Sequence, residues 1–273
     1  MPAKNKTTTL ALLAGTLMLA AATQAQANNV ITVGAYHFPP VAEVGDNKQA
    51  TGLLADLIQS LEAAHDDLDF RIIHTSPKRR HLDFDAGLYD VIFFESTNWG
   101  WTNRKVTASR PILEDEDFFI ALNKPDRGPD FFRDLGNRRL IGIAGYHYEF
   151  ANFETDTKAL QSNFKIEFSH GHSRNLELIK ADRPSVADVA IISRAYLQKH
   201  LSEHPEDRHR LLISDQPDQT YQLRVIARED GPISASDLYQ RMAPLVTDGS
   251  YQGLVEKWGL QMPADLANAS NRR

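Results

Sequence analysis

One acidic residue in the sequence lies where a ligand or a substrate could be held. Glu95 directly follows the apolar run Ile92-Phe93-Phe94 and should emerge where a buried strand ends. A carboxylate there could bind the ammonium group of a cationic solute, and it is also the residue that could serve an enzyme as its acid–base group. The alternative is an internal salt bridge, for instance to Arg80 or Arg104. The sequence leaves both interpretations open.

Aromatic side chains follow three of the expected strands, which should bring them to the same edge of a sheet. Aromatic faces stack on planar ligands or surround a cation, with about 0.5–2 kcal/mol for each cation contact. The alternative for any one ring is that it packs a loop. The rings are Tyr36, Phe38, Trp99, Trp101, Tyr146 and Tyr148.

Polar side chains with hydrogen-bonding chemistry accompany these rings. Ser96 follows the buried strand, and His147 lies among the aromatic residues. His147 and His172 could donate or accept hydrogen bonds in a cleft, although a lone His is more often a surface or packed residue. Ser173-Arg174-Asn175 opens an expected helix, whose free N–H groups could receive an anion. We therefore count Ser96, His147 and His172 among the candidate ligand contacts.

Two further patterns have chemical meaning but a simpler explanation. His200-Leu201-Ser202-Glu203-His204 matches the H-x-x-E-H spacing of inverted zinc peptidases, which need two His one helical turn apart. Pro205 follows where that helix would have to continue, so we expect no zinc site, and no other metal or cofactor. No G-x-S-x-G, P-loop or dinucleotide-binding glycine pattern occurs. The acidic run Glu114-Asp115-Glu116-Asp117 is interpreted as a solvated face.

Composition excludes several classes of protein. The 273-residue chain has 30 Lys and Arg against 36 Asp and Glu, a formal net charge of −6. A nucleic-acid binder that relies on a basic face is therefore not expected. The absence of cysteine excludes disulfides, thiolate metal sites and cysteine nucleophiles. With 42% hydrophobic residues, the chain can form one large or two medium domains.

The N-terminus has the layout of a secretory signal peptide. Lys4 and Lys6 precede an apolar stretch over residues 10–22, and Ala25-Gln26-Ala27 offers a cleavage site. The alternative, a transmembrane anchor, would need about 18 or more consecutive apolar residues. We expect residues 1–27 to be removed, and the remaining chain to be exported to the periplasm as a soluble monomer without a lipid anchor.

Strand and helix patterns alternate along the rest of the chain, which predicts mainly parallel sheets with crossover helices. In such sheets, ligands bind beyond the carboxyl ends of the strands. The expected strands are 30–33, 70–73, 90–94, 118–122, 140–143, 186–192 and 223–227, and the expected helices are 52–64, 81–86, 175–180, 194–200, 234–246 and 251–258.

The order of the motifs resembles that of the bacterial periplasmic solute-binding proteins of ABC transporters, of the amino-acid-binding (family 3) type. The likeness covers nearly all of the chain after residue 27. It rests on the segments Tyr36-His37-Phe38-Pro39-Pro40, Thr51-Gly52-Leu53-Leu54-Ala55-Asp56-Leu57, Ala86-Gly87-Leu88-Tyr89-Asp90-Val91-Ile92, Thr102-Asn103-Arg104-Lys105 with Ser109-Arg110-Pro111, Asp134-Leu135-Gly136 with Ile141-Gly142-Ile143-Ala144-Gly145, and the closing stretch from Asp248 to Gly259.

The resemblance implies an α/β chain of two lobes that close over a solute by hinge motion, the type II periplasmic binding protein fold. Lobe one would hold residues 28–121 and 224–262, lobe two residues 124–219, and residues 263–273 would form a C-terminal tail. Two crossing strands near 118–122 and 223–227 would form the hinge.

The resemblance also implies an Arg that clamps a ligand carboxylate and an Asp that binds its ammonium group. Counted without gaps, the Arg position falls on Thr102, with Arg104 two residues later, and the Asp position falls on Ser193. Arg104 could still serve as the clamp, whereas one of the two anchoring charges is replaced by a hydroxyl.

The predicted function is periplasmic binding of a small polar solute, such as an amino acid, a derivative or another amine, for delivery to the membrane permease of an ABC uptake system. The alternative is a ligand-sensing partner of a membrane receptor. An enzyme that uses Glu95 is the third hypothesis.

Overall fold

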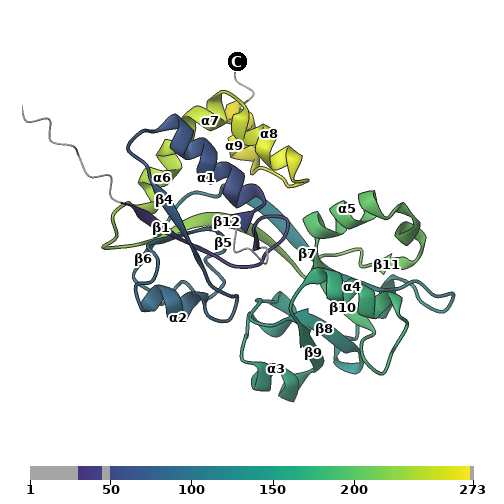
Figure 1. The fold of residues 1–273 in the computed structure, drawn as a ribbon. Helices are drawn as coiled ribbons and strands as arrows, with labels where there is room; N and C mark the ends of the chain where they lie inside the picture. Colours follow the sequence, from purple (N-terminus) through teal and green to yellow (C-terminus); the bar gives the residue numbers. More distant parts are fainter. Residues whose placement is uncertain (1–29, 45–49, 271–273) are drawn as a thin grey trace, which may run out of the picture.

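The computed structural model describes residues 30–44 and 50–270, and Figure 1 shows them as two lobes joined by two long strands. The predicted signal peptide, residues 1–27, lies outside the described residues. Among the described residues, no helix has the length and apolar character needed to cross a bilayer.

Lobe one is a mainly parallel sheet covered by helices. Its strand order is β4-β1-β5-β12, with β6 paired to the outer part of β12. The apolar spacing of α1 buries Leu53, Leu54, Leu57, Ile58 and Leu61, as the sequence predicted. The elements are β1 (Ile31–Ala35), β2 (Glu43–Val44), β3 (Ala50–Thr51), α1 (Leu53–Ala64), β4 (Phe70–His74), α2 (Arg80–Asp85), β5 (Val91–Glu95), β6 (Val106–Ala108), α6 (Ala235–Arg241), α7 (Ala243–Thr247), α8 (Ser250–Lys257) and α9 (Ala264–Ser270). Helix α9, within the segment predicted as a tail, packs against α7 and buries Leu266.

Lobe two is a second sheet with an apolar core on each face. Its strand order is β7-β10-β8-β9, with β11 also paired to β7. The elements are β7 (Leu113–Leu122), β8 (Arg139–Ile143), α3 (Thr157–Asn163), β9 (Lys165–Ser169), α4 (His172–Lys180), β10 (Val189–Ser193), α5 (Arg194–Glu203), β11 (Leu211–Ile213) and β12 (Gln219–Arg228), with 3₁₀ turns at Pro129–Phe132, Leu135–Asn137, Glu149–Ala151 and Pro205–His209.

Strands β7 and β12 run through both lobes and pair with each other where they cross. The antiparallel register joins Leu113 to Leu223 at one end and Asp117 to Gln219 at the other. Beyond this crossing, β7 pairs with β10 of lobe two and β12 pairs with β5 of lobe one. The crossing therefore lies at 113–117 and 219–223, a few residues before the segments predicted from their apolar runs. Those apolar runs are instead buried inside the two sheets.

The acidic run Glu114-Asp115-Glu116-Asp117 lies within β7, and its prediction as a solvated face is wrong for half of its members. Because side chains alternate along a strand, Glu114 and Glu116 remain partly exposed, whereas Asp115 and Asp117 are 1% and 4% exposed. The two buried carboxylates lie on one face of the hinge strand, between the lobes.

Candidate functional site

The carboxyl ends of strands from both lobes face each other, and aromatic rings fill the space between them. Phe38, which follows β1, contacts Trp99 edge-on at 6.0 Å between ring centroids and Tyr146 of lobe two at 5.9 Å. Trp99 stacks on His147 of lobe two at 6.4 Å. The sequence-predicted residues Tyr36, Phe38, Trp99, Tyr146 and His147 thus line one cavity, together with Arg80.

The two lobes touch across this interlobe cavity. Its volume is about 10 Å³, which leaves room for no more than about one water molecule. The hydroxyl of Tyr146 donates to the carbonyl of His37, 3.1 Å away on lobe one. Gly145 of lobe two has φ 86°, and a β-carbon there would lie 2.6 Å from the backbone nitrogen of Lys78 on lobe one. The structure is therefore a closed form, with backbone against backbone at Gly145.

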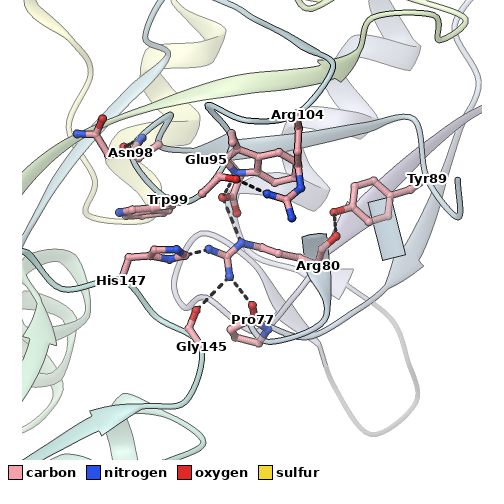
Figure 2. A network of polar contacts seen from close by, with 12 residues as sticks. Pro77, Arg80, Tyr89, Glu95, Asn98, Trp99, Arg104, Gly145 and His147 are labelled. Atoms are coloured by element: carbon pink, nitrogen blue, oxygen red, sulfur yellow. Dashed lines mark hydrogen bonds and ion pairs between the residues drawn. The ribbon is translucent and has the colours of Figure 1, made fainter. Parts of the chain in front are cut away.

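Arg80, the first residue of α2, connects the lobes from inside the contact (Figure 2). Its side chain is 1% exposed and donates to Glu95 Oε2 at 3.3 Å within lobe one. It also donates to the Gly145 carbonyl at 3.1 Å and to His147 Nδ1 at 3.0 Å, both on lobe two. The guanidinium lies 5.1 Å from the ring centre of Tyr36. Sequence reasoning considered Arg80 only as an ion-pair partner, because nothing in the polar stretch around it predicts a buried guanidinium.

Glu95 ends β5 and is completely buried. Its Oε2 accepts hydrogen bonds from Arg80 and, at 2.6 Å, from Trp101 Nε1. The internal salt bridge that the sequence left open is therefore formed, and its partner is Arg80 rather than Arg104. Oε1 of the same carboxylate has no hydrogen-bond partner among the described residues.

Four predicted site residues lie away from the interlobe cavity. Trp101 packs behind Glu95 against Phe84. Arg104 pairs with Asp85 at 3.1 Å and donates to the Gly100 carbonyl, and its side chain is 25% exposed. The other two are Tyr148, whose hydroxyl accepts from Ile143 N within the lobe-two core, and Ser96, which lines an open groove beside the hinge strand β12.

Lobe two presents a group of buried polar side chains at the carboxyl ends of β9 and β10. His172, Asn175 and Ser193 are each no more than 1% exposed. Among the described residues, Nδ2 of Asn175 and Oγ of Ser193 lack hydrogen-bond partners. His172 also lines a pocket of about 270 Å³ between the lobes, whose other walls include His37 of lobe one and Tyr196 of lobe two.

Burial keeps both interlobe histidines uncharged. It lowers the pKa of His147 to about 2, with Arg80 as a further cause, and it lowers the pKa of His172 to about 3. A neutral His147 carries a lone pair on Nδ1, which is the atom that accepts the Arg80 hydrogen bond. The contact between Arg80 and His147 therefore persists at neutral pH.

The buried acids of the hinge have different partners. Asp115 pairs with Arg194 at 3.3 Å and accepts from the backbone N–H of Ala195 at the start of α5. Asp117 accepts from Gln219 Nε2 at 2.9 Å and from the Tyr221 hydroxyl at 3.4 Å, both neutral groups on β12. Burial raises the pKa of Asp115 to about 7 and that of Asp117 well above its usual value, to which Asp218 and Asp115 also contribute. The sequence analysis placed Asp117 on a solvated face, although the alternation of side chains along a strand could have indicated its burial.

The H-x-x-E-H segment has a structural explanation. His200 Nε2 lies 2.8 Å from the carboxylate of Asp207, and His204 terminates helix α5. In the part of the chain that the structure describes, no group of three or more potential ligands could hold a metal ion.

Solved structures with a similar fold are two-lobed binding proteins. One is a binding component of an ABC transporter from Wolinella succinogenes in complex with lysine, with a TM-score of 0.66 and 17% identity over 85% of this chain and 96% of that one. Another is an ABC transporter substrate-binding protein from Streptococcus pneumoniae with bound histidine, with a TM-score of 0.65 and 18% identity over 84% and 92% of the two chains.

A third similar structure is a histidine kinase sensor domain that is itself similar to periplasmic binding proteins, with a TM-score of 0.64 and 16% identity over 86% of this chain and 99% of that one. No protein-family model matches the sequence, and no curated protein matches it. The structural likeness confirms the predicted fold: the chain has the two-lobed α/β architecture of type II periplasmic binding proteins.

Proposed function

We propose that the protein binds a small polar solute between its two lobes. The observation that carries this proposal is the presence of buried polar atoms without hydrogen-bond partners among the described residues in both lobes, at Glu95 Oε1 in lobe one and at Asn175 Nδ2 and Ser193 Oγ in lobe two. Buried polar atoms are almost always paired in native proteins, because an unpaired one costs about 1–3 kcal/mol. A bound solute with its own donors and acceptors satisfies them.

Binding on this account requires the lobes to separate first. The cavity lined by Phe38, Trp99, Tyr146 and His147 is about 10 Å³, too small for any organic solute. Opening at the β7–β12 crossing breaks the contacts from Arg80 to Gly145 and His147 and exposes the rings of Phe38, Trp99 and Tyr146. Closure over a solute then expels water and brings both lobes onto it.

The solute class follows from the chemistry of these surfaces. Aromatic rings and buried carboxylates suit an amine-bearing solute, such as an amino acid or a derivative. Similar structures hold lysine and histidine, which agrees with this class. We propose that the exported protein acts in the periplasm as a monomer and delivers its solute to the membrane permease of an ABC uptake system. Binding rather than catalysis is favoured, because Arg80 and Trp101 already hold the carboxylate of Glu95.

The proposal is tested by differential scanning fluorimetry on protein that has been unfolded, dialysed and refolded to remove carried-over solute. The panel contains L-lysine, L-arginine, L-histidine, L-cystine and putrescine, with succinate and glucose as amine-free controls. We expect at least one amine-bearing compound to raise the melting temperature in a concentration-dependent manner. A panel in which no amine-bearing compound changes the melting temperature contradicts the proposal.

A further inference from the structure

Asp117 differs from the other buried acids of the described residues in its partners. Five acidic side chains are classed as buried, and four of them have a basic partner: Asp83 with Arg79, Glu95 with Arg80, Asp115 with Arg194, and Asp207 with Lys180. Asp117, which is 4% exposed, has only the amide of Gln219 and the hydroxyl of Tyr221. Within the described ranges it is thus the buried carboxylate without a cation.

A second, independent feature lies directly beside it. Ser193, the last residue of β10, is the antiparallel register partner of Asp117 on β7. Side chains of directly opposed residues lie on the same face of a sheet, with β-carbons about 4.5–5.5 Å apart. The Ser193 side chain is 1% exposed, and its Oγ has no hydrogen-bond partner among the described residues. An unpaired hydroxyl and a carboxylate without a cation therefore lie next to each other on the same face of the sheet.

This pair is linked to the interlobe cavity by short contacts. The amide of Gln219 that donates to Asp117 also donates to the carbonyl of His147 at 2.6 Å, and its oxygen accepts from Trp99 Nε1 at 3.3 Å. The ring of Tyr221 contacts Trp99 edge-on at 5.0 Å. Both His147 and Trp99 line the cavity. Asp117 and Ser193 therefore lie on the hinge side of the solute site, one side chain away from its wall.

We propose that Asp117 and Ser193 form the subsite for a primary ammonium group of the solute, an inference that rests on the proposed function. The ammonium donates to the Asp117 carboxylate and to the Ser193 hydroxyl. Arg80 is paired with Glu95 and Arg194 with Asp115, so neither of these cations is paired with Asp117. On this proposal, the ammonium group of the solute supplies the positive charge that Asp117 lacks among the described residues.

Binding of a cation at this subsite changes the protonation of Asp117. Burial, with the neighbouring carboxylates of Asp218 and Asp115, raises the pKa of Asp117, while the hydrogen bonds from Gln219 and Tyr221 oppose the shift. His147 is neutral and adds no charge. The raised pKa favours the protonated acid in the free protein, and on this proposal an arriving ammonium displaces that proton. One proton leaves to solvent for each cation bound, while the ammonium keeps all of its own.

The test is titration calorimetry at pH 6.5 with L-lysine and L-arginine, each in two buffers of different ionisation enthalpy. The expected result is proton release on binding by the wild type that is clearly greater than the release by Asp117→Asn. This variant is isosteric with the protonated acid and can still accept from Gln219. We expect it to lower affinity by about 10- to 100-fold, the worth of a charge-assisted hydrogen bond. Glu114→Gln, which removes a charge from the other face of the same strand, should change affinity by less than about threefold.

Two results overturn the inference and leave the proposed function intact: ligand binding without proton release by the wild type, or Asp117→Asn with unchanged affinity. If Asp117→Asn does not fold, two other measurements test the inference. They are the number of protons that the wild type releases on binding and the affinity of Ser193→Ala, which should be lower by several-fold. If the wild type binds neither amino acid nor any other amine of the panel, the proposed function fails, and this inference fails with it.

Discussion

The guanidinium of Arg80 on lobe one lies 3.0 Å from Nδ1 of His147 on lobe two, and both side chains are buried. The same guanidinium is paired with Glu95, so one charged side chain holds the end of a lobe-one strand and the opposite lobe at once. One charged side chain therefore connects the two lobes in this closed form.

Replacing Arg80 should destabilise the protein strongly. Arg80→Met leaves the fully buried carboxylate of Glu95 without its cation, and breaking such a pair costs about 3–5 kcal/mol. Urea denaturation measures the loss. The control is Arg79→Met at the preceding position, where the side chain is 67% exposed and solvent screens its salt bridge to Asp83, so the loss should be much smaller. Equal losses in the free energy of unfolding for the two variants would contradict the expectation that the buried Arg80–Glu95 pair stabilises the protein more than the exposed pair.

Gly145→Ala should keep the lobes apart. The added β-carbon would lie 2.6 Å from Lys78 N across the interlobe contact, and φ is 86°. Gly87 has a similar φ of 73° but nothing within 4 Å of an added β-carbon, so Gly87→Ala carries only the conformational cost of about 1–2 kcal/mol. Small-angle X-ray scattering should give a larger radius of gyration for ligand-free Gly145→Ala alone. An unchanged radius would argue against the tight contact.

Asp218 should make the stability of the free protein depend on pH. Burial raises its pKa from 3.8 to about 6, although it accepts from the N–H groups of Glu149 and Phe150. Because the native state binds this proton more tightly, its contribution is complete below pH 3.8 and is lost as pH rises through about 6. Urea midpoints between pH 4 and pH 7 should therefore fall more for the wild type than for Asp218→Asn. If the urea midpoints of the two proteins change equally with pH, Asp218 is not the cause of the pH dependence.

Trp101→Phe should lower stability through one hydrogen bond. The indole donates to Glu95 Oε2 at 2.6 Å, and its removal costs this buried carboxylate one of its two partners. We expect a loss of about 1–3 kcal/mol in the free energy of unfolding, most of it from the charge-assisted hydrogen bond. Trp258→Phe is the matched control, because its indole donates to Asp56, a partly exposed carboxylate at the surface. The loss at Trp258 should be the smaller of the two, and the reverse order would contradict the assignment.

Much of the fold could be predicted from residue patterns. The apolar run ending at Phe94 predicted β5, and the helical spacing of Leu53, Leu57 and Leu61 predicted α1. The turn after β8 was also expected to bring Tyr146 and His147 to the interlobe face, where both line the cavity. These features depend on periodicity within one short segment, which the sequence displays directly.

The charged centre of the site could not be predicted in the same way. Arg80 lies in a polar stretch that resembles any solvated helix start, and its burial depends on Glu95 and on His147 of the other lobe. The pairing of Asp117 with Ser193 is a register between strands about seventy residues apart. Such relations arise from tertiary packing, and no local pattern encodes them.

The central claim is that a solute binds between the lobes, and hydrogen–deuterium exchange locates it most directly. With the amine-bearing compound that raises the melting temperature, we predict slower amide exchange on facing segments of both lobes, at residues 36–38 and 95–99 of lobe one and at 145–148 and 171–173 of lobe two. Protection confined to one lobe, or found only on the outer face of lobe two, would contradict binding in the interlobe site.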